Sequence, residues 1–213
     1  MKKLILASFI AFVSATTFAQ DKEVKKTERL SLGLKAGITF PAFAVSGGTT
    51  ANDVTTSGLT SFYAGVLVNI PLGNILSIQP GVSLIGKGGS VKQSNVTTKT
   101  SPLYVEIPVN AVVGIEMGPG KVMIGAGPYY AFGVSGKVKV GDQAETDITF
   151  GTGATSTLKS TDWGVNFLLG YQLHNGIGLN VGYGVGLQNV QPDDSIKGTY
   201  KSGVFSAGIS FLF

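Results

Sequence analysis

The chain has 213 residues, of which 43% are hydrophobic and only 13% charged, and it contains 31 glycines and no cysteine. Without cysteine, disulfide scaffolds, thiolate metal sites and cysteine nucleophiles are excluded. The formal net charge of +4 is small, and the chain has no basic stripe with interleaved aromatic residues, which argues against a nucleic-acid-binding protein.

The first 19 residues are typical of a secretory signal peptide. Lys2 and Lys3 precede an apolar run over residues 4–13, and small residues stand at Thr17 and Ala19. A transmembrane helix is the alternative, but this run is shorter than the roughly 20 residues that a bilayer span needs. We therefore expect cleavage after Ala19, which lowers the net charge from +4 to +2 because Lys2 and Lys3 are removed.

Residues 20–29 are a short charged segment, expected to be a periplasmic tail, and residues 30–213 follow a different pattern. In this second region apolar residues alternate with small or polar ones, as in strands that have one apolar face. No stretch of it approaches 18 consecutive apolar residues, so helical membrane spans are excluded. The predicted strands, each about ten residues long, cover residues 30–40, 62–70, 76–84, 103–115, 122–132, 163–173, 177–187 and 205–213.

The apolar faces of these strands carry no charged residue. A lipid-facing surface requires this, because Lys or Arg there costs roughly 2–4 kcal/mol at the bilayer midplane. Three connections are tight turns ("PLGN", "GPGK", "HNG"), and the other four are long and polar. Short turns on one side and long loops on the other predict an all-β, eight-stranded antiparallel up-and-down transmembrane β-barrel over residues 30–213, with both termini in the periplasm.

An open sheet is excluded, because about ten unpaired edge residues at several kcal/mol each in hydrocarbon would cost tens of kcal/mol. A secreted soluble barrel with an inward apolar face, or a β-sandwich, is the alternative. The small and polar second face favours the membrane barrel. Aromatic residues support this orientation, since they fall at two heights, as in interfacial girdles. The predicted outer girdle comprises Phe40, Phe62, Tyr130, Phe132 and Trp163, and the periplasmic girdle Tyr171, Phe211 and Phe213.

Three prolines lie inside consecutive predicted strands, at Pro80, Pro108 and Pro128. Each removes a donor from the hydrogen-bond ladder, which argues against unbroken central strands. All three fall near mid-height. We therefore expect a band of bulges or widened pairing across the third to fifth strands.

Charged residues on the inward face predict a polar network in the lumen. An eight-stranded barrel leaves an interior only wide enough for side chains, and a buried charge without a partner is expensive. Lys35 is therefore expected to pair with Glu106 or another inward carboxylate. The predicted network comprises Lys35, Glu106, Glu116, Asp162, Tyr63 and Tyr104.

The network has two interpretations, a structural plug or a narrow path for water or small ions. The path is suggested by inward glycines that leave one wall without side chains, at Gly178, Gly182, Gly184 and Gly186. Bulky tyrosines, Tyr129 among them, can occupy the same space.

Four segments carry a family resemblance: "LSIQPGVSLIGKG", "YVEIPVNAVVG", "GAGPYYAFGVSGK" and "DWGVNFLLGYQLHNGIGLNVGYGVGLQNV". In this order they resemble the small PorT-like outer-membrane β-barrel domain family of Gram-negative bacteria, over nearly the whole of Leu30 to Phe213. The resemblance implies a barrel fold. It implies no active-site residues, and family members include proteins with roles in secretion or assembly at the outer membrane.

Residues with catalytic potential are few. His174 is the sole histidine, in the "HNG" turn, and gives neither a triad nor a metal cluster. We therefore predict no enzyme activity, no cofactor and no metal; a lipid-modifying enzyme is the remaining enzymatic alternative. Ser195 lies in "DSI", which resembles the acceptor of some bacterial O-glycosylation systems.

The function expected from these patterns is that of a non-enzymatic integral outer-membrane protein, structural, adhesive or accessory to envelope or secretion assembly. A narrow pore for water, ions or small solutes is the alternative. Expected partners are outer-membrane lipid and lipopolysaccharide, other envelope proteins, and the outer-membrane insertion machinery, for which Phe211 and Phe213 resemble the terminal aromatic signal.

Overall fold

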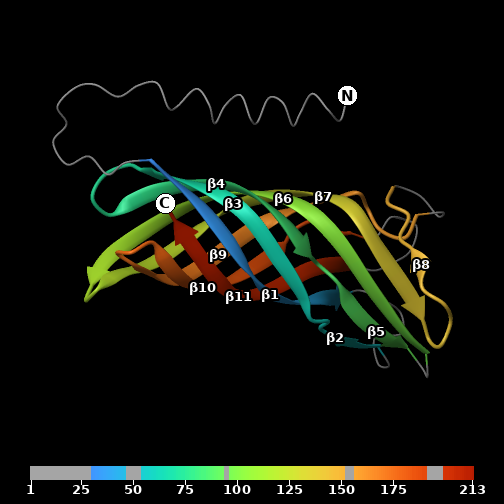
Figure 1. Ribbon diagram of the computed structural model, residues 1–213. Helices are drawn as coiled ribbons and strands as arrows, with labels where there is room; N and C mark the ends of the chain where they lie inside the picture. The colour runs from blue at the N-terminus through green and yellow to red at the C-terminus, as the bar shows by residue number, and fades with distance from the viewer. Residues whose placement is uncertain (1–29, 47–53, 94–95, 152–155, 191–198) are drawn as a thin grey trace.

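The computed structural model describes residues 30–213 apart from 47–53, 94–95, 152–155 and 191–198 (Figure 1). The expected signal peptide (1–19), the expected tail (20–29) and the candidate glycosylation site Ser195 lie outside the described residues. The regular structure of the described part consists of strands. None of its segments forms a helix long and apolar enough to cross a membrane.

Eight strands form a closed ring in which every neighbouring pair is antiparallel. The first and last strands close the ring, in a register that runs from Gly33 opposite Leu212 to Ser46 opposite Thr199. The predicted fold class is thereby confirmed. The ring strands, in order around the barrel, are β1 (Ser31–Ser46), β3 (Ser61–Pro71), β4 (Leu76–Gly86), β6 (Val96–Met117), β7 (Gly120–Val140), β9 (Thr161–Leu173), β10 (Ile177–Gly186) and β11 (Thr199–Leu212).

Three short strands extend the sheet beyond the ring: β2 (Val54–Ser57), β5 (Gly89–Gln93) and β8 (Thr146–Asp147). All lie at the end of the barrel opposite the C-terminus, where the long connections are (Figure 1). β6 and β7 also continue into this end and reach 22 and 21 residues. The long polar connection expected around residues 86–100 is therefore partly regular, because residues 89–93 of β5 pair with residues 96–100 of β6.

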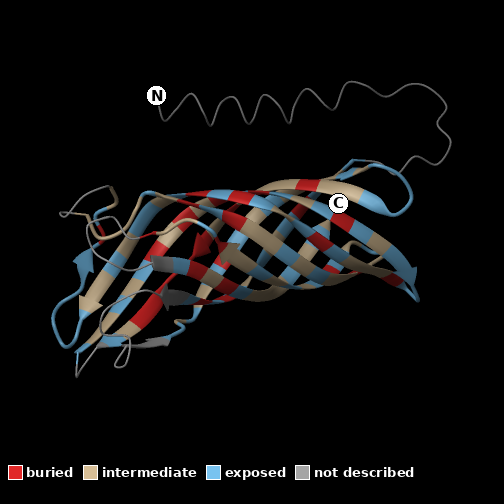
Figure 2. Ribbon diagram, turned by 180° about the vertical axis from the view of Figure 1, so that it is seen from behind, coloured by how far each residue is buried: buried red, intermediate tan, exposed pale blue. Residues whose placement is uncertain are grey.

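The predicted apolar faces point away from the barrel axis. Leu34, Ile38, Phe62, Ile124 and Ile209 are representative, each with more than a third of its surface exposed. Buried and exposed positions alternate along the strands, as the bands of colour in Figure 2 show. This is the pattern expected when lipid covers one face and the lumen the other.

The aromatic girdles are made of interacting pairs. At the outer level, Phe40 lies 6.2 Å from Phe205, and Tyr130 lies 4.9 Å from Phe132, between ring centroids. At the other level, Phe211 and Phe213 meet edge to face at 5.0 Å. Such tilted and edge contacts are the arrangements that aromatic rings prefer.

The three prolines coincide with gaps in consecutive ladders. Pairing skips residues 79–80 of β4 opposite 68–69 of β3, residues 81–82 of β4 opposite 107–108 of β6, and 109–110 of β6 opposite 127–128 of β7. The register is the same on both sides of every gap, so pairing is interrupted rather than bulged. The expected band of widened pairing exists, and the one register shift of β6 and β7 occurs elsewhere, between Leu103 and Tyr104.

Candidate functional site: the barrel lumen

A buried ion cluster crosses the outer half of the lumen. Lys87 Nζ lies 2.7 Å from Glu106 Oε2 and 3.0 Å from Asp162 Oδ2. The side chains of Lys87, Glu106 and Asp162 are 3%, 6% and 1% exposed. These three residues come from the end of β4, from β6 and from the start of β9, so the cluster bridges separate parts of the wall.

Neutral groups add hydrogen bonds to both carboxylates, and Asp162 Oδ1 stays without a partner among the described residues. Asn166 Nδ2 donates to Glu106 Oε1 at 3.0 Å, and the Tyr129 hydroxyl donates to Asp162 Oδ2 at 3.1 Å. The Tyr129 ring also lies below the lysine ammonium, with its centroid 3.8 Å from Lys87 Nζ. Hydrogen bonds and a cation–π contact of this kind offset part of the cost of burying charge.

An apolar layer surrounds the ion cluster and adjoins the outer mouth. Tyr63, Ile85, Tyr104, Tyr129, Ala131 and Val204 form one buried group. Phe150, from the connection between β8 and β9, packs edge to face on Tyr104 at 5.7 Å. The Tyr104 hydroxyl donates to the Lys159 carbonyl at 3.3 Å. The connection therefore covers the lumen from outside.

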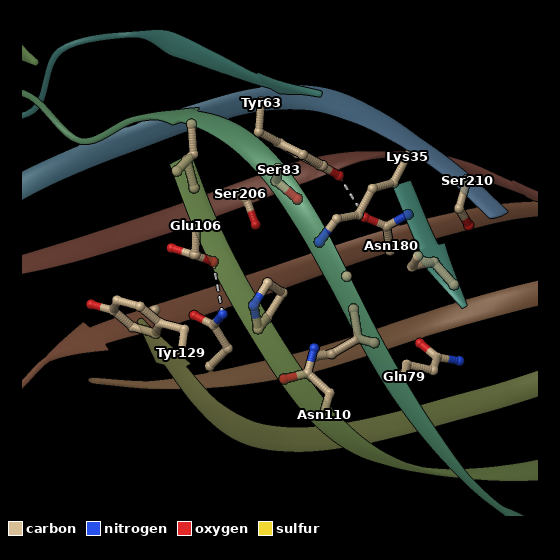
Figure 3. A pocket seen from close by; sticks show the side chains of 18 of the residues that line it. Lys35, Tyr63, Gln79, Ser83, Glu106, Asn110, Tyr129, Asn180, Ser206 and Ser210 are labelled. Atoms are coloured by element: carbon tan, nitrogen blue, oxygen red, sulfur yellow. Dashed lines mark hydrogen bonds between the residues drawn. The ribbon is translucent and has the colours of Figure 1, made fainter. Parts of the chain in front are cut away.

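Tyr63 occupies the opposite wall of the lumen. Its hydroxyl donates to Asn180 Oδ1 at 2.7 Å (Figure 3). Its ring lies over two glycines: a Cβ built at Gly37 would be 2.7 Å from Tyr63 Cε1, and one at Gly208 would overlap its hydroxyl. The absence of side chains on β1 and β11 at these points is what allows the ring to lie flat against the wall.

The inner half of the lumen contains a cavity of about 110 Å³. Its polar lining is mainly amides and hydroxyls, including Gln79, Asn110, Ser206 and Ser210 (Figure 3). Among the described residues, Asn110 Oδ1 and Ser83 Oγ are buried without a hydrogen-bond partner. Towards the periplasmic end a second space of about 330 Å³ shares Gln79, Met123, Gln172 and Leu212 with the first.

The structure brings together four of the six predicted network residues, namely Glu106, Asp162, Tyr63 and Tyr104, around the outer half of the lumen. Lys35 lines the cavity below them and interacts electrostatically with Glu106. Within the described part of the chain it has no ion-pair partner within 4.0 Å, and its Nζ lies 6.0 Å from the Tyr63 ring centroid. The expected Lys35 to Glu106 ion pair is therefore wrong, because Lys87 occupies that position.

Glu116 lies outside the network. Its side chain is 62% exposed, at the periplasmic end of β6, where Lys121 Nζ and His174 Nε2 approach it to 3.2 and 2.9 Å. Glu116 is on the same face of β6 as Glu106, as predicted. At this position, however, close to the turn, the strand has already left the closed part of the barrel. A largely exposed ion pair of this kind contributes little to stability.

Sequence alternation did not place Lys87 in the lumen, because the predicted strand ends at residue 84. The inward positions of β4 are every second residue from Ser77 to Ile85, and Lys87 is the next member of that series. Its amide still donates to the Pro102 carbonyl at 3.1 Å, so β4–β6 pairing persists to this point. Extending the period of two by one step would have found it.

The inward glycines of β10 do not leave an open wall. A Cβ at Gly178 would meet Gln172 Oε1 at 2.6 Å, one at Gly182 would meet Ser206 Oγ at 2.8 Å, and one at Gly184 would meet Asn166 Oδ1 at 2.9 Å. Side chains from β9 and β11 therefore lie over these glycines. The expected side-chain-free wall along β10 is therefore narrowed by its neighbours, and Gly182 and Gly184 still line the cavity.

Chemistry beyond this network is sparse in the described part of the chain. No group of three His, Asp or Glu residues there could hold a metal ion. His174 is exposed and contacts Glu116. Phe213 donates its amide to the Leu32 carbonyl at 2.8 Å and its ring is exposed. That Phe211 and Phe213 serve as an insertion signal stays a prediction.

The profile of a family described as "outer membrane protein beta-barrel domain" matches residues 18–191. The chain belongs to this family. It is an integral protein of the bacterial outer membrane. Comparison with curated proteins gave no match.

Among solved structures, the chain is similar to three outer-membrane proteins of other bacteria. Neisserial surface protein A is 16% identical, with 87% of this chain and 100% of that one covered and a TM-score of 0.46. OprG of Pseudomonas aeruginosa is 11% identical, with 86% and 95% covered and a TM-score of 0.45. Ail, the attachment invasion locus protein of Yersinia pestis, is 10% identical, with 86% and 98% covered and a TM-score of 0.44.

Proposed function

We propose that this outer-membrane barrel is a closed, non-enzymatic scaffold that presents its outer strands and connections to the cell surroundings. The ion cluster of Lys87, Glu106 and Asp162 is the observation that carries the proposal. It lies across the outer half of the lumen and its side chains are buried. The apolar layer described above and Phe150 cover it. A solute would have to break several charge-assisted hydrogen bonds to pass.

The role of the presented surface is structural, adhesive or accessory to envelope assembly. The PorT-like character suggested by "QPG" at residues 79–81 and "EIP" at 106–108 supports the last of these. We also propose that the chain is exported by a cleaved signal peptide and inserted by the outer-membrane insertion machinery. Crosslinking in whole cells from the outer strands would identify neighbouring envelope proteins and separate a scaffold with partners from one without.

Conductance in planar bilayers tests whether the lumen is closed. We expect the purified, folded wild type to give no steady current steps. A Tyr63→Ala/Tyr129→Ala variant, which removes two rings from the lumen, serves as the opened control and should conduct. Reproducible steps from the wild type, at a frequency that follows the amount of folded protein, would overturn the closed scaffold.

A narrow pore is the second candidate, because the inner cavity continues towards the periplasmic mouth. Gln79, Met123 and Gln172 line both spaces, so the outer cluster is the main barrier. If the lumen is a narrow pore, Lys87→Met should raise the conductance, because it removes the ion pairs that close the outer half. A silent wild type together with a silent Lys87→Met variant that is folded would exclude a pore gated by this cluster.

A further inference from the structure

Four lysines gather on the outward face of the sheet that extends beyond the ring. Lys99 of β6 lies directly opposite Lys139 of β7, and Lys137 lies opposite Ser101 two residues below. On β5, Lys92 lies opposite Thr97, which shares the face of Lys99. We call Lys92, Lys99, Lys137 and Lys139 the lysine strip.

A bulge puts the β7 lysines on this face. Below it, odd-numbered residues of β7 such as Tyr129 point into the lumen. Between Leu103 and Tyr104 the partner changes from Ser135 to Gly133, so Val134 is an additional residue in β7. One extra residue transfers all later side chains to the other face of a strand. Without it, Lys137 and Lys139 would point inward.

Among the described residues, the directly opposed lysines have no acidic partner. Like charges facing each other across two strands are destabilising, with Cβ atoms about 5 Å apart. Within the described part of the chain, neither Lys99 nor Lys139 has an ion-pair partner within 4.0 Å. The acidic residues nearby serve Lys137 instead: Glu145 Oε2 lies 3.7 Å from its Nζ, and Asp147 is its register partner on β8. An anion between Lys99 and Lys139 would remove the repulsion.

The strip lies at the height of lipid headgroups. On β6 the outward apolar series ends at Leu103, four residues below Lys99. At about 3.4 Å per residue and a tilt of about 40°, this is roughly 10 Å above the edge of the hydrocarbon. Lys side chains reach several ångströms from the backbone and extend towards such an interface. On β7, exposed Val134 lies at the register shift next to Leu103 and marks the same apolar edge.

We propose that the lysine strip binds the phosphate groups of a phosphorylated glycolipid of the outer leaflet, lipopolysaccharide, with one phosphate between Lys99 and Lys139. Lysine is an established phosphate ligand, and each Lys near an anionic membrane surface favours association. A lipid fits better than a soluble anion, because the same two strands carry an apolar surface that begins four residues below Lys99, at Leu103. The inference rests on the outer-membrane position of the barrel and not on whether its lumen conducts.

The test measures retention of diphosphoryl lipid A by the full-length barrel in neutral phosphatidylcholine nanodiscs, by native mass spectrometry. We expect diphosphoryl lipid A to be retained at least tenfold better than the dephosphorylated lipid. Lys99→Gln/Lys139→Gln should weaken this retention about 10- to 30-fold. Lys121→Gln/Lys201→Gln, which removes the same charge from other positions, should retain the lipid as the wild type does.

Stability in neutral detergent gives an independent readout. Because it relieves repulsion, Lys99→Gln should raise the unfolding midpoint slightly without lipid A, and lower the stabilisation that lipid A confers. This opposite pair of effects also shows that the variant folds. Equal loss of retention in the two double variants, or no loss in either, would overturn the proposal. Equal competition by inorganic phosphate would also overturn it, since the strip would then take soluble anions.

Discussion

The two halves of the lumen are filled by different kinds of side chain. The outer half is filled by charge, with Lys87 between Glu106 and Asp162 and rings packed around them. The inner half holds amides, hydroxyls, glycines and Lys35 around a cavity of about 110 Å³, which reaches Lys87 and Glu106 at its outer end. Charged side chains are long and need exact partners, whereas small neutral ones tolerate gaps. The difference teaches that closure of this barrel is concentrated in a few residues of one half.

Removal of the central cation should lower the stability of the outer half more than any other single change. In Lys87→Met, Glu106 and Asp162 remain buried without their counterion, and removing one partner of a buried pair typically costs about 3–5 kcal/mol. Urea unfolding in detergent micelles, followed by heat-modifiable gel mobility, measures the loss. Exposed Lys201→Met is the matched control and should change little.

A neutral cluster separates charge from shape in the same experiment. In Lys87→Met/Glu106→Gln/Asp162→Asn, no buried charge remains unpaired, so much of the lost stability should return. If the triple variant is as unstable as Lys87→Met alone, packing rather than charge maintains the outer half.

Loss of the Tyr63 hydroxyl, which bonds across the lumen to Asn180, should have a moderate effect. Tyr63→Phe removes the hydrogen bond to Asn180 but retains the ring, at a cost of about 0.5–1.5 kcal/mol for a typical bond. Unfolding in urea measures it against Tyr130→Phe, whose ring lies on the outward face. Equal effects in the two variants would show that the Tyr63 hydroxyl contributes nothing specific.

The periplasmic rim should give the smallest effect. Glu116→Gln breaks contacts with Lys121 and His174, but Glu116 and His174 are exposed and Lys121 is partly exposed, so these contacts contribute little. We expect the unfolding midpoint to match that of the wild type between 50 mM and 500 mM salt. A clearly lower unfolding midpoint of Glu116→Gln at low salt would show that ion pairs stabilise the periplasmic end as well.

The fold could be predicted from sequence because lipid enforces a strict rule. An outward position such as Ile38 or Ile209 must be apolar. The period of two is therefore clear in the sequence, and it predicts where the strands lie and which residues face the lipid. The lumen imposes no comparable rule, since charged, polar and small residues all fit it. Parity therefore places Glu106 and Asp162 inside, but it predicts Lys35 and not Lys87 as their partner.

Two further features were hidden for different physical reasons. The alternation of residues does not predict at which residue a strand leaves the closed barrel. It therefore predicts that Glu116 lies in the lumen. The bulge at Val134 reverses parity within one continuous strand, and Lys137 and Lys139 were therefore read as part of a loop. A sequence pattern reports which face a residue shares with its neighbours, and only pairing reveals where that face changes.

Tyr63 also has a consequence for how the barrel forms. From β3 it touches β1 and β11 over Gly37 and Gly208, and bonds to Asn180 on β10, 117 residues away along the chain. No partial sheet that lacks the last two strands can make this set of contacts. A spectroscopic label reporting on the Tyr63 environment would therefore time the moment at which the two ends of the sheet meet, apart from the earlier growth of hairpins.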